Sequence, residues 1–125
     1  MRHAAIWIGL GLALLNARGE ASAVSKCAVG RICSVRGVLV ATHRTGAIRD
    51  DSGCIAVALP AFVPDGWNGR TVKASGLVYR AVDLPGLVTY KLKDRMVDAE
   101  ACYSGRVLFV DRIETAKSAL KAPQP

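Results

Sequence analysis

The 125-residue sequence lacks the motifs of several large functional classes. It has no Cys-x-x-Cys pair and only two histidines, of which His43 alone lies outside the N-terminal segment, so no metal site is expected. It has no Gly-x-Gly-x-x-Gly or P-loop motif that would cradle a phosphate. It also has no Gly-x-Ser-x-Gly nucleophile elbow. We therefore predict a protein without a cofactor and without catalytic activity.

The composition excludes disorder, collagen and coiled coil for the chain as a whole. Apolar residues make up 51% and charged residues 22%, with 12 Gly and only 5 Pro, and the length allows one ordinary domain. The 17 Lys and Arg against 10 Asp and Glu give a net charge of +7. Without Arg2, Arg18 and Glu20 of the N-terminal segment, 15 basic and nine acidic residues leave +6. This charge permits an anionic partner, but the basic residues form no run, which favours a solvated exterior.

The N-terminus has the organisation of an export signal. Met1 to His3 is basic, Ala4 to Leu15 is an apolar run of twelve, and Ala21 to Ala23 is the small-x-small pattern that a signal peptidase recognises. A transmembrane helix needs about 20 apolar residues, and Asn16 to Glu20 ends the run earlier. We predict that residues 1–23 are a cleaved signal peptide and that the mature chain begins at Val24. It would be periplasmic or secreted, with no transmembrane segment.

Four cysteines remain in the predicted mature chain, and an even number in a small exported domain favours disulfides. Three pairings are compatible with the sequence. We favour Cys27 with Cys33 and Cys54 with Cys102. In the chain-entropy model, the second bridge closes a loop of roughly 50 residues and stabilises by about 4 kcal/mol, against about 2 kcal/mol for the first.

From Cys33 onward the chain has the pattern of short β-strands separated by turns, with no long stripe at helical period. Gly37 and Gly76 fall in the middle of two strands, which is typical of a bulge or of the strong coiling that closes a small barrel. The predicted strands are 35–41, 47–50, 54–59, 70–80 and 106–114.

The remaining segments are less regular. Residues 60–69 are expected to form a loop, and 87–95 a further hairpin arm, whereas 96–102 is expected to be one helical turn. Val107, Phe109 and Ile113 are expected to face the interior. Residues 115–125 read as a flexible tail.

Several of these segments together resemble an OB-fold, especially the oligonucleotide and tRNA-anticodon-binding type. They are Val35-Arg36-Gly37-Val38, residues 48–55, Trp67-x-Gly69-Arg70 and Val72-x-x-x-Gly76-x-Val78. The resemblance covers residues 33–79, with 107–113 as closing strand. It implies an all-β domain over residues 24–114, a five-stranded barrel with an irregular insertion before the last strand, stapled by disulfides. Exported bacterial OB-fold proteins of unassigned function are a second, looser resemblance.

The chain departs from the nucleic-acid-binding members at one position. Those relatives carry a base-stacking aromatic residue on the second strand, and residues 47–50 contain none. Because stacking supplies about 1 to 3 kcal/mol per base, its absence would leave salt-sensitive phosphate contacts.

The candidate contact surface is an exposed basic and aromatic face formed by Arg36, Arg49, Lys73 and Tyr79. Trp67 could bind a sugar face or could plug the barrel, and the sequence does not decide between the two. Asp50 and Asp51 could form an acid–base pair, but adjacent strand residues point to opposite faces, so we favour a turn with Asp as acceptor. His43 would need a triad for which the sequence gives no support.

We predict a non-catalytic binding module for a protein or an anionic cell-envelope glycan. Single-stranded nucleic-acid binding is one alternative, and an inhibitor or immunity protein acting on another exported protein is a second. The sequence leaves the ligand, the oligomeric state and the biological process open.

Overall fold

The computed structural model describes residues 21–42 and 44–115. Outside these residues lie residues 1–20 of the predicted signal peptide, His43, and residues 116–125 of the predicted tail. The tail prediction is wrong at its first residue, because Thr115 is buried and ends the last strand. No helix in the described ranges has the length and apolar character needed to cross a membrane. The elements are η1 (Val24–Lys26), β1 (Ile32–Thr42), β2 (Thr45–Asp50), β3 (Gly53–Ala58), η2 (Asp65–Trp67), β4 (Thr71–Arg80), β5 (Thr89–Leu92), β6 (Arg95–Asp98) and β7 (Arg106–Thr115).

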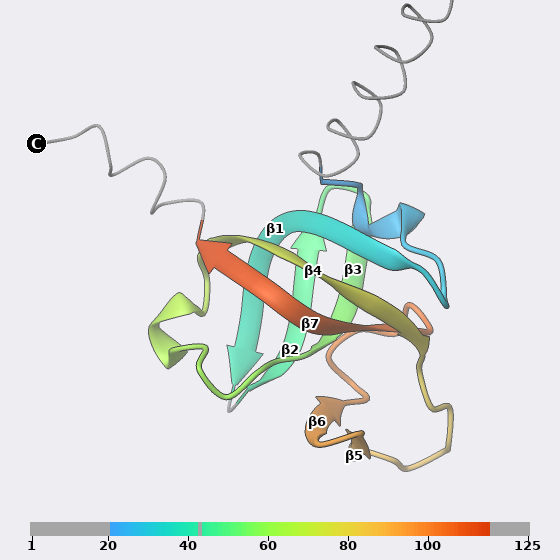
Figure 1. The fold of residues 1–125 in the computed structure, drawn as a ribbon. Helices are drawn as coiled ribbons and strands as arrows, with labels where there is room; N and C mark the ends of the chain where they lie inside the picture. Colours follow the sequence, from blue (N-terminus) through green and yellow to red (C-terminus); the bar gives the residue numbers. More distant parts are fainter. Residues whose placement is uncertain (1–20, 43, 116–125) are drawn as a thin grey trace, which may run out of the picture.

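Five of the strands form a closed barrel in the order β1-β2-β3-β7-β4, with β4 returning to β1 (Figure 1). The β3–β7 pair is parallel and the other pairs are antiparallel. The predicted all-β class, five-stranded barrel and five strand positions are confirmed. This arrangement is compatible with an OB-fold-like barrel.

Two glycines allow the barrel to close. β1 pairs with β4 through its first half and with β2 through its second half, so Gly37 lies where the strand changes neighbours. A Cβ at Gly37 would collide with the carbonyl oxygen of Arg49, and a Cβ at Gly76 with that of Phe109. A side chain at either glycine would push the adjacent strand away, which agrees with the expected bulge or strong coiling, and Gly76 lies at a register shift of β4 and β7.

The barrel interior is filled by alternating apolar side chains. On β3 and β4 the inward faces are those predicted from period-two alternation. The chain before β1 also contributes, since Val24 of η1 is fully buried in the same cluster. The largest fully buried side chains of this core are those of Val24, Val35, Leu39, Ile48, Ile55, Val57, Val72, Val78, Leu108 and Val110.

The predicted inward face of the last strand is wrong for its first half. Leu108 and Val110 enter the barrel core, whereas Val107 and Phe109 face outward. The β4–β7 register shifts between Ser75 and Gly76, which is a β-bulge. Because a bulge inserts one residue, the alternation reverses and Ile113 packs against the core as predicted.

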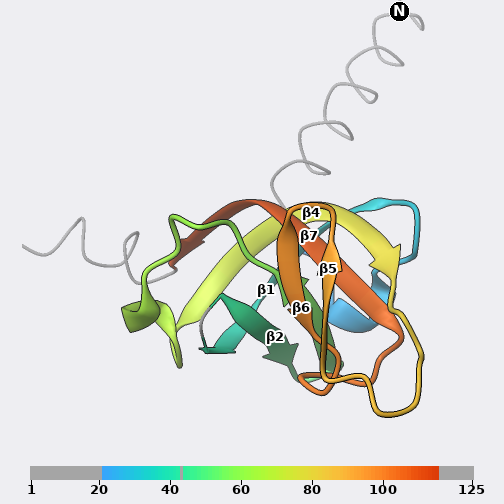
Figure 2. The same cartoon turned by 90° about the horizontal axis from the view of Figure 1, so that it is seen from below.

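The insertion before the last strand contains a β-hairpin formed by β5 and β6. The predicted helical turn over 96–102 is wrong, because Met96 to Asp98 pair with β5. Figures 1 and 2 show the hairpin outside the barrel. Its apolar side chains pack with small residues on the outer faces of β2 and β3, forming a second cluster with Ala47, Ala56, Ala58, Val97, Cys102 and Val107 buried. The hairpin therefore covers the outer face of these two strands around the three alanines, whereas Arg49 of β2 stays exposed.

Both predicted disulfides are confirmed. Cys27–Cys33 joins the N-terminal segment to β1, with a sequence separation of 6. Cys54–Cys102 spans a separation of 48 and fastens the end of the insertion to β3. No cysteine in the described part of the chain is free.

Candidate functional site

The structure brings three of the predicted contact residues to neighbouring positions. Arg36 on β1 is the cross-strand partner of Lys73 on β4, and Arg49 lies on β2, the other neighbour of β1. Arg36 and Arg49 are exposed, and Lys73 is half-buried. Glu114 of β7 is the next residue in register beyond Lys73, so this outer face carries charges of both signs.

Tyr79 does not belong to that face. It lies at the far end of β4, where its ring makes an edge contact with Phe109 at a centroid distance of 6.0 Å. The Lys93 Nζ lies 5.6 Å from the centre of the Tyr79 ring. Tyr79 is therefore half-buried beside the hairpin and takes part in its packing.

Trp67 lies apart from the basic face, in η2, and its half-buried side chain packs against the barrel core. The loop around it is fixed to β1, because the backbone N–H of Gly69 donates to Leu39 O at 2.6 Å and that of Ala41 to Asn68 Oδ1 at 2.8 Å. This placement matches the alternative in which Trp67 plugs the barrel.

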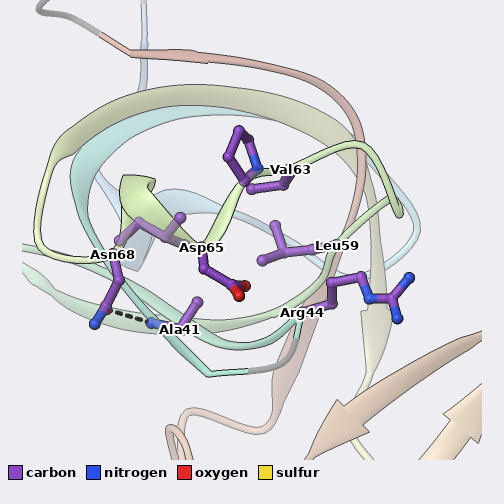
Figure 3. A pocket seen from close by; sticks show the side chains of 8 residues that line it. Ala41, Arg44, Leu59, Val63, Asp65 and Asn68 are labelled. Atoms are coloured by element: carbon purple, nitrogen blue, oxygen red, sulfur yellow. Dashed lines mark hydrogen bonds between the residues drawn. The ribbon is translucent and has the colours of Figure 1, made fainter.

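The end of the barrel beside η2 has little free space (Figure 3). A cavity of about 10 Å³, which is room for about one water molecule, is lined by Ala41, Leu59 and Val63 among others. The Asp65 carboxylate points into this space and the Arg44 guanidinium points away from it. Two open clefts of about 370 and 350 Å³ adjoin Arg44, and their linings also mix acidic and basic side chains.

A larger depression of about 640 Å³ lies between the two ends of the insertion. We call it the stapled groove, because Cys102 in its lining is held to β3 by the disulfide. Most of the residues in its lining are apolar, and the lining contains two acidic residues, Asp83 and Glu100, but no basic residue. The groove is lined by Ala81, Val82, Asp83, Leu84, Pro85, Gly86, Leu87, Val88, Ala99, Glu100, Cys102, Tyr103 and Gly105.

The backbone of the stapled groove is fixed by local bonds. The Leu87 N–H donates to Leu84 O at 3.1 Å across Pro85-Gly86, with φ +79° at Gly86, as in a type II turn. The N–H of Ala99 donates to Val88 O at 2.7 Å, which joins the two walls. Together with the disulfide, these bonds hold the groove in place without a ligand.

Sequence reasoning missed the apolar rim of this groove. Leu84, Val88 and Tyr103 are 61%, 53% and 82% exposed, and Val82 is 42% exposed. The available signal was the apolar residues that flank Pro85-Gly86 in a turn, where solvated side chains are usual. Only the structure shows that this turn faces the segment around Tyr103.

Asp50 acts as a structural acceptor, as the turn interpretation predicted. Its Oδ1 accepts from the Ser52 N–H at 2.8 Å and from Ser52 Oγ at 2.5 Å, and its Oδ2 accepts from the Val24 N–H at 2.9 Å. Desolvation opposes ionisation, but these bonds and one from the Gly53 N–H outweigh it and lower the pKa of Asp50 below its ordinary value. Asp50 is thus a charged anchor for the chain before β1.

The described ranges contain no group of three His, Cys, Asp or Glu side chains that could hold a metal ion. Comparison with protein-family models, curated proteins and solved structures finds no match to this chain.

Proposed function

We propose that this protein is an exported, non-catalytic binding module that holds an apolar, basic segment of a protein partner in the stapled groove. The single observation that carries the proposal is the concentration of exposed apolar side chains. Of the ten large apolar side chains exposed in the described ranges, four line this groove. Contiguous apolar surface of this kind marks interaction sites, because exposing it to water is unfavourable.

The charge of the groove specifies the partner further. Asp83 and Glu100 are exposed in its lining, although the chain as a whole is basic. A Lys or Arg side chain flanking an apolar anchor would complement these carboxylates. A glycan is less well matched, since Tyr103 is the only aromatic residue in the lining.

Preorganisation also supports binding at this place. The type II turn, the inter-wall hydrogen bond and the Cys54–Cys102 bridge fix the walls before a partner arrives. Less conformational entropy is then lost on binding. An inhibitor or immunity protein would use the same kind of surface, and the identity of the partner distinguishes these roles.

Nucleic-acid binding has less support. OB-folds bind oligonucleotides on the face of their second and third strands and with the adjacent loops. Here the hairpin packs on that face of β2 and β3, and the basic face around Arg36 includes Glu114. Measuring the affinity for single-stranded DNA, RNA and envelope glycans at two salt concentrations tests this alternative. Tight binding that falls steeply with salt would favour it over a protein partner.

The proposed location follows from the predicted signal peptide. Two disulfides and the absence of a spanning helix in the described residues are compatible with the periplasm or the cell exterior. We propose that the bridges form there after export.

The groove is tested by cross-linking and charge reversal. A photoreactive residue at Leu84 should cross-link a partner in envelope extracts, whereas one at the exposed Val40 of β1 should not. Leu84→Glu should abolish capture of the same partner, and Glu100→Lys should weaken it. Val40→Glu is the matched control and should leave capture unchanged.

A second measurement defines the occupant. Labelled peptides with alternating leucine and lysine should bind the purified chain, and leucine–glutamate peptides of the same length should not. Equal binding of both peptides, or capture that is insensitive to Leu84→Glu, would overturn the groove as the binding site.

A further inference from the structure

We propose that Asp50 binds the α-ammonium group of Val24 that cleavage after Ala23 creates. This inference rests on the proposed export and on cleavage at the predicted position. The segment concerned, residues 21–27, lies within the described part of the chain.

The geometry of such a site is already formed around the Val24 nitrogen. This nitrogen lies 2.9 Å from Asp50 Oδ2, across a sequence separation of 26 residues. The Val24 side chain is fully buried in the core, whereas Ala21, Ser22 and Ala23 are exposed. Val24 is therefore the first buried residue of the described chain, and it directly follows the predicted scissile bond.

Contacts beyond Val24 hold the new terminus in place. The Ser25 N–H donates to Ser52 Oγ at 3.1 Å, and Ser52 in turn donates to Asp50. Arg106 Nη1 donates to the carbonyl oxygens of Val24 and Cys27, at 2.7 Å each. With the Cys27–Cys33 bridge, these contacts fix Val24 without the residues that precede it.

Cleavage changes the chemistry of one atom at this site. Water adds across the Ala23–Val24 peptide bond, its hydroxyl to the Ala23 carbonyl carbon and its proton to the Val24 nitrogen. The resulting amine takes a further proton from solvent at neutral pH. An N–H donor to a carboxylate becomes an ammonium donor, and charge-assisted bonds of this kind are the stronger ones.

Cleavage also removes two hydrogen bonds between backbone groups. Ala23 O accepts from the Lys26 N–H at 2.9 Å, and the Ser22 N–H donates to Ser34 O at 2.6 Å. The total stability of the processed chain therefore combines a gain and a loss. The coupling between the ammonium and Asp50 is the quantity that isolates the proposed bond.

Other charged side chains also lie near this terminus. Arg106 bonds the carbonyl of Val24, opposing a positive charge at the nitrogen. Lys26 and Asp51 are exposed on the adjoining η1 and on the β2–β3 turn. Asp50 is the carboxylate that touches the Val24 nitrogen, so its removal should have an effect that removal of Asp51 lacks.

The test compares three chain termini in the purified protein. One form begins at Val24 with a free amine, a second carries an acetyl group on that nitrogen, and a third retains Ala21 to Ala23. The acetyl group keeps the N–H and an acceptor for Lys26 but removes the charge. Each form is made with Asp50→Asn and, as matched control, Asp51→Asn.

Asp50→Asn should reduce the folding equilibrium constant about fivefold more in the free-amine form than in the acetylated form. Asp51→Asn should reduce the folding equilibrium constant by the same factor in all three forms. The pKa of the Val24 amine, followed by NMR, should be higher in the wild type than in the Asp50→Asn variant. Equal losses in the three forms, or an unchanged amine pKa, would overturn the proposal.

Because the free terminus is generated in vitro by a protease that leaves no extra residue, this result does not depend on export. Amino-terminal sequencing of the protein recovered from the cell envelope tests cleavage at Ala23 separately. A start at another residue would contradict the export proposal at this bond, while the Asp50 coupling would still be measured.

Discussion

Arg95 of the hairpin stacks on Phe109 of β7, with its guanidinium carbon 3.9 Å from the ring centroid. The same guanidinium donates through Nη1 to Ala58 O at 2.9 Å and to Val110 O at 2.6 Å. Ala58 is the last residue of β3, at the point where its parallel pairing with β7 ends. Arg95 therefore joins the hairpin to two strands of the barrel and satisfies carbonyl groups there.

Arg95→Ala should lower the free energy of unfolding by about 2 kcal/mol, because it removes the cation–π contact and leaves two acceptors without this donor. Arg95→Lys should recover only part of the loss, since an ammonium lacks the planar fork. Urea unfolding measures the free energy of unfolding of both variants. Lys91→Ala, at an exposed position of β5, is the control, and an equal loss there would contradict the assigned role.

Gly37→Ala and Gly76→Ala should each destabilise the barrel by about 3 kcal/mol or more, because the added Cβ meets a backbone carbonyl that cannot move alone. Gly66→Ala adds a Cβ where nothing lies within 4 Å and should change little. Thermal unfolding of the three variants makes the comparison. A mild effect at Gly37 would mean that β1 and β2 can separate.

Replacing Cys54 and Cys102 by Ala should cost about 4 kcal/mol, and replacing Cys27 and Cys33 about 2 kcal/mol, because the longer loop loses more entropy on closure. The first pair of changes should also raise hydrogen exchange across residues 87–103 and weaken partner binding in the groove. Urea unfolding and exchange measurements test this order. The reverse order of stabilities would show that strain or residual structure outweighs loop length.

Asp50 should contribute to stability above its ordinary pKa and lose that contribution in acid. Hydrogen bonds lower its pKa in the folded state below the ordinary value, so the folded state binds the proton less readily than the unfolded state. The stability difference between wild type and Asp50→Asn should be constant from neutral pH down to about pH 5 and shrink as the pH falls through the folded-state pKa. Urea midpoints measure both stabilities, and curves that stay parallel below about pH 5 would contradict the prediction.

The strand positions were predictable because period-two alternation and mid-strand glycines are local features. Ile55, Val57 and Leu59 lie in the core as the alternation implies. The alternation predicted the wrong face for Phe109. A bulge elsewhere on β7 changes the alternation along that strand, and the Phe109 side chain packs with the hairpin outside the barrel. Asp50 could be read as a turn acceptor, but its bond to Val24 joins residues 26 positions apart, which no local pattern indicates.

The sequence by itself determined the β class and the positions of the barrel strands, because these depend on composition and short-range periodicity. The five-stranded barrel was implied by the resemblance to an OB-fold, and the favoured cysteine pairing was one of the three that the sequence allows. The tertiary structure decided which surfaces remain available. It packed the hairpin on β2 and β3, placed Glu114 beside Lys73, and brought Leu84 and Tyr103 to one groove. These relationships arise between segments distant in the chain, where only the closure of the barrel and the Cys54–Cys102 bridge fix which side chains meet.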